Sequence, residues 1–599
     1  MLLTHAAAAA VFALVNLARA SPAPNFARSS PLAAVSKPNI VFIIVDDQDA
    51  RQNSIDTMPH LQRLLVDEGT RFTKFYAPIS VCCPSRSSFL RSQCAHNTNI
   101  TSVMPPYGGW SVFNEKGMNG HYLPTFLANA NYDVRYVGKL MNGHSVNAFT
   151  GDFEADGFVD HAFLLDPNTY DYWSPAFSRA NGTVEYRPGE YSTDLVAEKA
   201  IAFLNQAAET PDKPFFLGVA PIAPHSHIST SGHSGGFPGL FDLPRAAPRH
   251  AHLFQDVKLN YSRESHNPDV PSGASWVRTL DKLNSTNVEY IEEFYRARLQ
   301  ALQAVDELVE GVINKLEEIG KLGDTIVIYT SDNGFEANAG HRRQPGKTLP
   351  YEEDINVPLV VRGPAVPRGL VDNHSVYSLA DLGSTILHLA GAQADYDHDG
   401  SLVPLTHELR EQVEWDGGAK GFHLAEYWVE GIGEGKYGSG ITRVNQTYRA
   451  VRVVEGDEIN YSYAVWCTGE REIYDLNTDP DQMHNLALAA LAPTSFTARL
   501  HTRLDALLLV LKSCSGDSCR DPWKVFFRDG KVQSLRTALD EDYDAYFEAL
   551  PRVRYSECRL GFHIKLEAPF WTDDLAYSPG KEYAPLNAGL GTSQIVLSA

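Results

Sequence analysis

The stretch Asn39-Ile40-Val41-Phe42-Ile43-Ile44-Val45-Asp46-Asp47 carries an apolar run directly into a pair of carboxylates. A short run of this kind, rich in Ile and Val, predicts a strand buried on both faces of a parallel sheet. Ligands of open parallel sheets bind outside the carboxyl ends of the strands, so we expect polar residues that follow the strands to meet at one edge. Three more apolar runs precede polar residues in this way: residues 132–138 before Lys139, residues 215–220 ahead of His225, and residues 325–330 before Asp332 and Asn333.

The segments between these runs have the pattern of helices. The clearest covers residues 292–319, where apolar residues recur at intervals of three and four and Gly320 supplies a stop. Alternating strands and helices predict an α/β fold with a mostly parallel central sheet sandwiched by helices. Short strand-like pieces such as residues 448–454 follow later in the chain. We therefore expect a larger domain over residues 38–400 and a smaller C-terminal α+β domain over residues 401–599.

The composition is that of a globular protein with an acidic balance. Apolar residues make up 43% of the chain and charged residues 21%, which argues against wholesale disorder and against multiple membrane spans. The formal net charge of -22 makes nucleic acid a poor partner, because phosphate backbones are bound by clustered Lys and Arg. An anionic substrate would have to be bound by local cations, against the field of the whole chain.

Residues 1–20 have the pattern of a secretory signal peptide, and residues 21–37 that of a linker. An apolar stretch from Ala6 to Leu17 precedes Ala18-Arg19-Ala20, which matches a small-residue cleavage site. A buried helix is the alternative for this Ala-rich opening. No other stretch is long and apolar enough to span a bilayer. The sequence therefore predicts a secreted or secretory-lumen protein, whether extracellular, in the cell wall, or vacuolar or lysosomal, with no membrane span in the mature chain.

Seven cysteines and seven Asn-x-Ser/Thr sequons fit a eukaryotic secretory route. Cys514 and Cys519 enclose a short loop that a disulfide closes easily, whereas Cys94, Cys467 and Cys558 have no partner that the sequence assigns. The odd number leaves at least one cysteine free, modified or paired with another chain. The predicted glycosylation sites are Asn99, Asn181, Asn260, Asn284, Asn373, Asn445 and Asn460.

Four of the residues at strand ends, Asp46, Asp47, Asp332 and Asn333, offer only oxygen ligands. Oxygen donors suit calcium or magnesium better than zinc, whose sites favour His and Cys, and we expect one calcium ion rather than magnesium. Three carboxylates brought together without a cation would repel one another, so their convergence implies a bound ion. The alternative is structural: an Asp-Asp helix cap and an Asp-Asn-Gly turn.

The stretch Cys82-Cys83-Pro84-Ser85-Arg86, followed by Ser87-Ser88-Phe89-Leu90, resembles the signature of the sulfatase family: Cys, any residue, Pro, Ser, Arg. The resemblance spans nearly the whole chain after the leader and implies an alkaline-phosphatase-like fold. Further blocks resemble the family in the same order along the chain: Pro38-Asn39-Ile40 to Asp46-Asp47, Thr330-Ser331-Asp332-Asn333-Gly334, Gly346-Lys347 ahead of Pro350-Tyr351-Glu352-Glu353-Asp354, and Glu472-Ile473-Tyr474-Asp475-Leu476 with Asp479-Pro480 and Asn485-Leu486.

The resemblance also implies a nucleophile. In this family the first cysteine of the signature is oxidised to formylglycine by a formylglycine-generating machinery, which implies that Cys82 is the modified residue. An aldehyde hydrate offers one hydroxyl to attack sulfur and a second whose deprotonation expels sulfate. Arg86 would support the hydrate and Asp332 would assist its activation. The calcium ligands implied by the family are Asp46, Asp47, the modified Cys82, Asp332 and Asn333.

The remaining roles that the resemblance implies concern the sulfate group and the leaving group. Lys139 and Lys347 would bind sulfate oxygens, and His225 would protonate the departing alkoxide or phenoxide. His227 and His341 are competing histidines.

The chain departs from the family at one position. Many sulfatases have Lys, any residue, His after the second strand, and that histidine breaks down the sulfate intermediate. Met141 stands at this position, in Gly138-Lys139-Leu140-Met141-Asn142. This variant resembles the branch that contains glucosamine-6-sulfatases. Asn142, His144, another histidine or water are the alternatives for the missing base.

The resemblance implies hydrolysis of a small sulfate-ester substrate, and we expect an arylsulfatase that releases a phenol or alcohol and inorganic sulfate. One competing hypothesis is an N-acetylglucosamine-6-sulfatase acting on sulfated glycans, although the negative charge of the chain disfavours a polyanionic substrate. Two further hypotheses are a phosphatase or phosphonate hydrolase of the same superfamily, and a catalytically inactive carbohydrate-binding relative in which Cys82 stays unmodified.

Overall fold

Strand β1 (Asn39–Val45) lies inside an eight-stranded sheet, and all of its residues are buried. The computed structural model describes residues 37–52, 54–229, 241–261, 263–415, 418, 420–438, 442–488 and 495–584. Neighbouring pairs from β9 to β5 are parallel, whereas β10 runs antiparallel to both of its neighbours. The order across the sheet is β11 (Leu370–Asp372), β2 (Thr70–Phe72), β10 (Leu359–Arg362), β9 (Thr325–Ser331), β1, β8 (Phe215–Ala220), β4 (Asp133–Gly138) and β5 (Asp160–Phe163).

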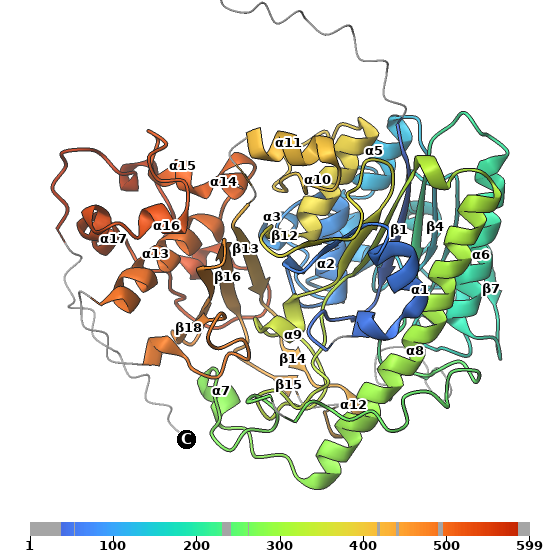
Figure 1. Cartoon of the computed structure of the whole chain (residues 1–599), viewed down its shortest axis with the longest axis horizontal. Coiled ribbons are helices and arrows are strands. Elements are labelled where there is room, and N and C mark those ends of the chain that lie inside the picture. Colours follow the sequence, from blue (N-terminus) through green and yellow to red (C-terminus); the bar gives the residue numbers. More distant parts are fainter. Residues whose placement is uncertain are drawn as a thin grey trace, which may run out of the picture. The chain divides into compact units, whose positions relative to one another are not determined.

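Helices cover both faces of this sheet, because successive side chains of a buried strand point to opposite faces. One row of β1 side chains packs with α2 (Cys82–Arg91), α5 (Leu123–Asn129) and α10 (Leu379–Ala390). The alternate row packs with α6 (Ser192–Ala208) and α8 (Ser285–Glu318). Figure 1 shows α6 and α8 together at one flank of the sheet. The predicted α/β class with a mostly parallel sheet is confirmed.

The long helix α8 begins before its apolar pattern does. The periodicity predicts a start at residue 292, but the helix begins at Ser285, where the side chain of Asn284 accepts a hydrogen bond from the backbone N–H of Asn287 (3.0 Å). The first turn carries mostly polar residues that are exposed or half-buried, and only Tyr290 and Ile291 extend the buried apolar stripe ahead of residue 292. The asparagine cap is the signal that marks the true start.

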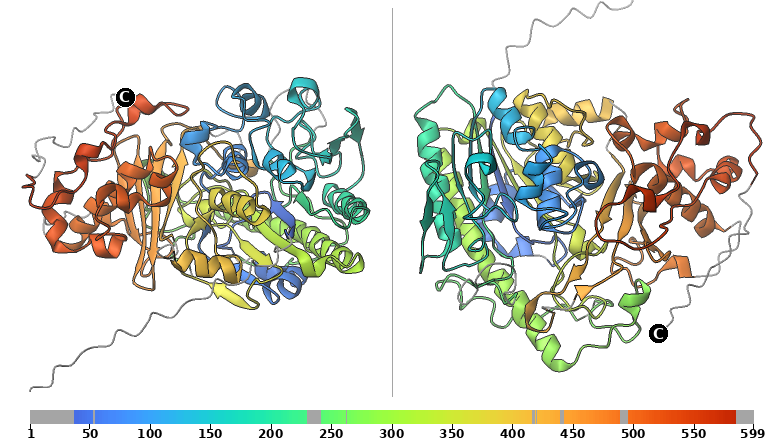
Figure 2. Two further views of the ribbon diagram at one scale, coloured as in Figure 1. Left: turned by 90° about the horizontal axis from the view of Figure 1, so that it is seen from above. Right: turned by 180° about the vertical axis from the view of Figure 1, so that it is seen from behind.

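A second, antiparallel sheet follows in the C-terminal part of the chain. One of its faces packs on α13 (Phe496–Leu511) and the short helices after it, and its other face packs on the larger part of the chain. Figure 2 shows this sheet between those helices and the central sheet. Its strands are β13 (Phe422–Tyr427), β16 (Tyr448–Glu455), β17 (Ile459–Trp466) and β18 (Arg471–Asp475). The C-terminal α+β character is confirmed, and the boundary at residue 400 stays a prediction.

The predicted signal peptide and all but the last residue of the predicted linker lie outside the described residues. Within the described ranges, no helix has both the length and the apolar character needed to cross a bilayer.

Candidate active site

Four neighbouring strands bring polar residues to one edge of the central sheet. Asp46 and Asp47 follow β1, Lys139 follows β4, and Asp332 follows β9, while His225 lies just beyond the end of β8. The Lys139 Nζ atom lies 2.5 Å from Asp46 Oδ2, and His225 Nε2 lies 3.6 Å from Asp47 Oδ2. All of these side chains are buried. The parallel register thus places residues that are hundreds of positions apart in one site.

Asp47 has the left-handed backbone conformation, with φ of 71°. Aspartate tolerates this conformation better than most residues, but it is still uncommon and is typical of sites where function depends on a sharp change of chain direction. Two contacts hold the turn: the Asp47 N–H donates to Asp332 Oδ1 (3.1 Å), and its carbonyl accepts from Arg298 (2.6 Å). The turn directs consecutive carboxylates into the same site.

Cys82 is the first residue of helix α2. Its Sγ atom lies 3.4 Å from Asp46 Oδ1, 3.9 Å from Asp47 Oδ1 and 3.6 Å from Lys347 Nζ. Burial, reinforced by the negative charge of Asp46, raises the pKa of the Cys82 thiol well above its usual value. The helix is formed by ten residues, and its first residue, Cys82, places the helix N-terminus at the same site.

Arg86 lies one turn further along α2 and connects two strand ends. Its Nε donates to Asp332 Oδ2 (2.8 Å) and its Nη1 to the backbone carbonyl of Lys139 (2.5 Å). The Nη2 atom is buried and has no hydrogen-bond partner among the described residues. Ser85 adds a bond from its hydroxyl to the backbone carbonyl of Asp332 (2.5 Å). The sulfatase-like motif is therefore attached directly to the ends of β4 and β9.

Two lysines neutralise the paired carboxylates. Lys347 Nζ lies 2.5 Å and 2.6 Å from the two carboxylate oxygens of Asp47. Lys139 Nζ lies 2.5 Å from one carboxylate oxygen of Asp46. Burial would raise the pKa of Asp46, but Lys139, His225 and Arg86 together outweigh it and the pKa lies below its usual range. Lys347 and His225 together lower the pKa of Asp47 against the effect of burial. For both lysines burial alone would lower the pKa, but the carboxylates raise it, so all four groups are charged.

The site contains a group of side chains that could hold a metal ion. Ligand atoms of Asp46, Asp47, Cys82 and His225 lie within 4.8 Å of one another. Asn333 Oδ1 is buried and has no hydrogen-bond partner among the described residues, while its Nδ2 donates to Asp47 Oδ1 (2.6 Å). An oxygen left without a partner beside two carboxylates is a free acceptor that a cation would satisfy.

Of the three candidate histidines, only His225 lies with the carboxylates. Its ring stacks on Tyr170 at a centroid distance of 4.3 Å, and its Nδ1 is within 2.8 Å of the backbone carbonyl of Ser226. The ring of His341 stacks on Tyr351 instead (4.4 Å). The Nδ1 atom of His227 accepts from the backbone N–H of Tyr172 (3.5 Å). The structure therefore separates His225 from its two competitors.

None of Met141, Asn142 and His144 takes the place of the histidine that many sulfatases have after the second strand. The Met141 side chain is buried in the apolar core and its sulfur accepts from Ser87 (3.8 Å). Asn142 donates to the Tyr170 hydroxyl (2.6 Å), so it reaches the ring that stacks on His225. His144 is fully buried, its ring lies 5.0 Å from that of Trp110, and burial lowers its pKa to about 3.

The structure adds two residues that the sequence patterns do not indicate. Tyr170 lies against both His225 and Lys139, whose Nζ is 4.9 Å from the ring centroid. Glu434 reaches the site from the C-terminal part of the chain, with its Oε1 3.5 Å from Lys347 Nζ. Neither residue follows a predicted strand. The one sequence feature that marks Glu434 is its place between two glycines, in Gly433-Glu434-Gly435.

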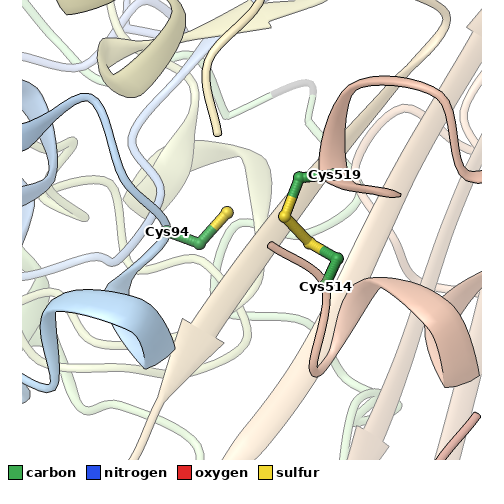
Figure 3. A group of neighbouring side chains, drawn as sticks. All are labelled: Cys94, Cys514 and Cys519. Carbon is green, nitrogen blue, oxygen red and sulfur yellow. A yellow bond between two sulfur atoms is a disulfide. The ribbon is translucent and has the colours of Figure 1, made fainter. Parts of the chain in front are cut away.

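The cysteines form two disulfides and leave three thiols. The predicted bond between Cys514 and Cys519 is present, and a second bond joins Cys467 to Cys558. Cys82, Cys83 and Cys94 are free. Figure 3 shows Cys94 beside the disulfide between Cys514 and Cys519, and the sulfur atoms of these three residues lie within 4.8 Å of one another.

Comparison with known proteins identifies the family. The family model described as Sulfatase matches residues 38–392. An arylsulfatase of Volvox carteri is 35% identical over 567 residues, which cover 89% of this chain and 83% of the relative. The N-acetylglucosamine-6-sulfatase of Homo sapiens is 28% identical over 518 residues, covering 82% of this chain and 87% of the relative. The structure of yidJ from Bacteroides fragilis matches with a TM-score of 0.58 at 19% identity, covering 83% of this chain and 98% of that one. This chain belongs to the sulfatase family, hydrolases that act on sulfate esters.

Proposed function

We propose that this sulfatase is an arylsulfatase that cleaves small sulfate monoesters, with a nucleophile made from Cys82 and one bound calcium ion. The observation that carries the proposal is the position of Cys82, at the N-terminus of α2 and within 4 Å of Asp46, Asp47 and Lys347. A group at this position would meet a sulfate ester among paired charges at a helix N-terminus. The 35% identity with an arylsulfatase over most of the chain supports the aryl class.

Two groups would supply chemistry that the unmodified side chains lack. Formylglycine made from Cys82 by the modifying machinery would supply, as its hydrate, a hydroxyl for attack on sulfur. Calcium held by Asp46, Asp47, Asp332, Asn333 and the modified residue would supply positive charge that favours the ionised hydroxyl. Arg86 is ready to donate to the hydrate, because its buried Nη2 has no other partner among the described residues.

The chain's own residues would bind the sulfate and move the proton. Lys139 and Lys347 present buried ammonium groups to the sulfate oxygens, where they would stabilise the charge that develops during transfer. The Nδ1 atom of His225 is occupied by a backbone carbonyl, which leaves Nε2 to protonate the departing oxygen. Asp332 would hold Arg86 in place while it assists activation of the nucleophile.

The test combines mass spectrometry with an assay. We expect the tryptic peptide that contains Cys82 to carry an aldehyde, and the protein to hydrolyse a chromogenic aryl sulfate. Cys82→Ala should abolish turnover without changing the thermal melting curve, whereas Cys94→Ala should leave turnover unchanged. An unmodified thiol throughout the preparation would favour the inactive carbohydrate-binding relative, and an active protein with no turnover of any aryl sulfate would exclude the arylsulfatase assignment.

A second candidate function is a 6-sulfatase of glucosamine-containing glycans. The burial of Met141 in the core favours it, since this position cannot act as the base and the same variant marks that branch of the family. The similarity to the human N-acetylglucosamine-6-sulfatase is consistent with this hypothesis. A 6-sulfated disaccharide assayed beside the aryl sulfate separates the two, because the better substrate will show the higher kcat/KM.

Calcium dependence has its own test. Dialysis against a chelator should remove activity and lower the melting temperature, because the ion binds only the folded chain and so stabilises it. Calcium should restore both properties better than magnesium, whose octahedral demands suit this side-chain set less well. Full activity in a preparation shown by elemental analysis to be free of metal would contradict the proposal.

We also propose that the chain passes through the secretory route. Its two disulfides suit an oxidising compartment. Six of the seven sequon asparagines are exposed, whereas Asn460 is half-buried and its Oδ1 accepts from Arg452 (3.0 Å). N-terminal sequencing of the secreted protein tests the cleavage site after residue 20, and glycopeptide mapping should find Asn460 the least occupied sequon.

A further inference from the structure

Glu434 touches two different parts of the candidate active site. Its Oε1 lies 3.5 Å from Lys347 Nζ, and its Oε2 accepts a hydrogen bond from the hydroxyl of Ser226. The side chain is 3% exposed. A buried carboxylate is stable only with charged or hydrogen-bonding partners, and these two supply them. Both partners lie next to the proposed chemistry, because Ser226 directly follows His225.

The backbone around Glu434 is joined to the loop that carries Lys347. The Glu434 N–H donates to the carbonyl of Pro345 (2.8 Å), and Gly433 forms a β-bridge with Gly346. A Cβ atom added at Gly433 would meet the backbone of Gly438 at 2.6 Å, so the close approach requires glycine. The position of Glu434 relative to Lys347 is therefore set by the backbone as well as by the ion pair.

The contact with Ser226 bears on the orientation of His225. Two contacts hold the His225 ring, from the Ser226 carbonyl to Nδ1 (2.8 Å) and from the stacked Tyr170 ring. The backbone carbonyl of His225 is held by the Tyr172 hydroxyl, which donates to it (2.8 Å). Glu434 holds the side chain of the residue whose carbonyl contacts Nδ1. A shift of Ser226 would therefore rotate the ring and move Nε2 away from the leaving oxygen.

We propose that Glu434 is a positioning residue that holds Lys347 on the sulfate and, through Ser226, aims His225 at the leaving oxygen. The inference rests on the proposed function. Glu434 touches no reacting atom, so its removal acts through geometry. Protonation of the leaving group matters most for a basic alkoxide and least for an acidic nitrophenolate. Loss of Glu434 should therefore penalise esters of basic alcohols more than esters of acidic phenols.

The experiment measures kcat/KM for a series of aryl sulfates of rising phenol pKa, and for one sugar sulfate. Glu434→Gln keeps the shape and removes the charge, Ser226→Ala removes only the link toward His225, and Glu430→Gln is the control, a half-buried glutamate four positions earlier in the chain. We expect Glu434→Gln to lose a few-fold on the most acidic phenol, rising to about 100-fold on the poorest leaving group. Ser226→Ala should show the same trend with a smaller loss on good leaving groups, and Glu430→Gln should match the wild type.

The outcomes are distinct. An equal loss on every ester for both variants, or no loss, overturns the positioning role toward His225. Because Glu434→Gln can destabilise a buried pair, its melting temperature is measured, and Ser226→Ala decides the question alone if the first variant does not fold. A wild-type protein that hydrolyses no sulfate ester counts against the proposed function instead, since the inference concerns only the dependence on the leaving group.

Discussion

Arg86 is buried to 2% exposure and bonds the side chain at the end of one strand and the carbonyl at the end of another. Arginine suits this position because its planar fork donates along several directions at once and stays charged when buried. Without it, the nearest cation to this oxygen of the fully buried Asp332 carboxylate would be Lys139, whose Nζ lies 3.8 Å away. A single side chain thus joins α2 to the sheet and pairs with a metal-ligand candidate.

Replacement of this arginine should be costly. Arg86→Met keeps most of the volume but leaves the buried Asp332 with only the more distant Lys139 as a cationic partner, and we expect the free energy of unfolding to fall by about 3 kcal/mol. Arg63→Met is the matched control, because Arg63 is 59% exposed and pairs with Glu310 at the surface. The control should lose less than about 1 kcal/mol. Urea denaturation measures the free energy of unfolding of the two variants. Equal losses would show that the buried ion pair contributes no more to stability than the exposed one.

Gly138 ends strand β4 immediately before Lys139, with φ of 103°. A Cβ atom there would lie 2.0 Å from the carbonyl oxygen of Ala220 on the adjacent strand β8. That same carbonyl accepts from the Lys139 N–H (2.9 Å), so the close approach of two backbones sets the exit direction of the lysine. At the scale of the element, a glycine positions a charged group by allowing two strand ends to touch.

Gly138→Ala should therefore reduce catalytic activity more than it reduces the stability of the fold. The added methyl group must push β4 from β8 and displace Lys139, and we expect kcat/KM to fall about 100-fold, since a misplacement of 1 Å can cost that much. Gly323→Ala is the control, because a methyl group added there would have no atom within 4 Å and its φ is not positive. Steady-state kinetics of the two variants measures the difference, and similar kcat/KM values would contradict the role of Gly138.

The apolar runs predict β1, β8 and β9 well, because strands buried on both faces leave a continuous signal that needs no tertiary information. Strand order then brings the residues at their ends together. Glu434 and the bond between Cys467 and Cys558 were not predictable in this way. Both depend on loops and a C-terminal tail whose path is decided by packing, and spacing in the sequence carries no record of that path.

At the scale of the whole molecule, two disulfides close loops of very different length. Cys467 and Cys558 are separated by 91 positions, and Cys514 and Cys519 by 5. A crosslink across a longer loop removes more conformational freedom from the unfolded chain. Replacing both members of the long bond with Ser should therefore lower the free energy of unfolding by about 2–4 kcal/mol, and replacing both members of the short bond by less. Guanidinium denaturation of the two double variants checks the order, which would be reversed if local strain or packing dominated.

Acid should destabilise the fold through buried histidines. Burial is the main cause that lowers their pKa values to about 3 or 4, so the unfolded chain binds more protons than the folded chain between about pH 4 and 6.5. Stability is therefore fully present above pH 6.5 and is lost as the pH falls. The histidines concerned are His96, His144, His341, His423 and His501.

His144 offers the clearest check, since neither of its ring nitrogens has a partner among the described residues. His144→Phe should reduce the loss of stability by about 1.4 kcal/mol per pH unit below 6.5. His484→Phe, at a side chain that is 65% exposed, should leave the slope unchanged. Urea denaturation at pH 7, 6 and 5 measures the slopes, and identical slopes for the two variants would exclude His144 as a source of acid sensitivity.

The burial of Cys82 also limits the time during which its side chain is accessible to a modifying enzyme. With 1% of its surface exposed in the folded chain, its side chain is out of reach of any modifying enzyme. The walls that enclose it include Asp332, which follows β9, so the pocket cannot close until some 250 further residues have been synthesised. At the usual pace of translation of 5–20 residues per second, this leaves an interval of roughly 10 to 50 seconds. The proposed oxidation of Cys82 would have to happen before the strands assemble, so we expect a faster-folding variant to keep more of its thiol unconverted.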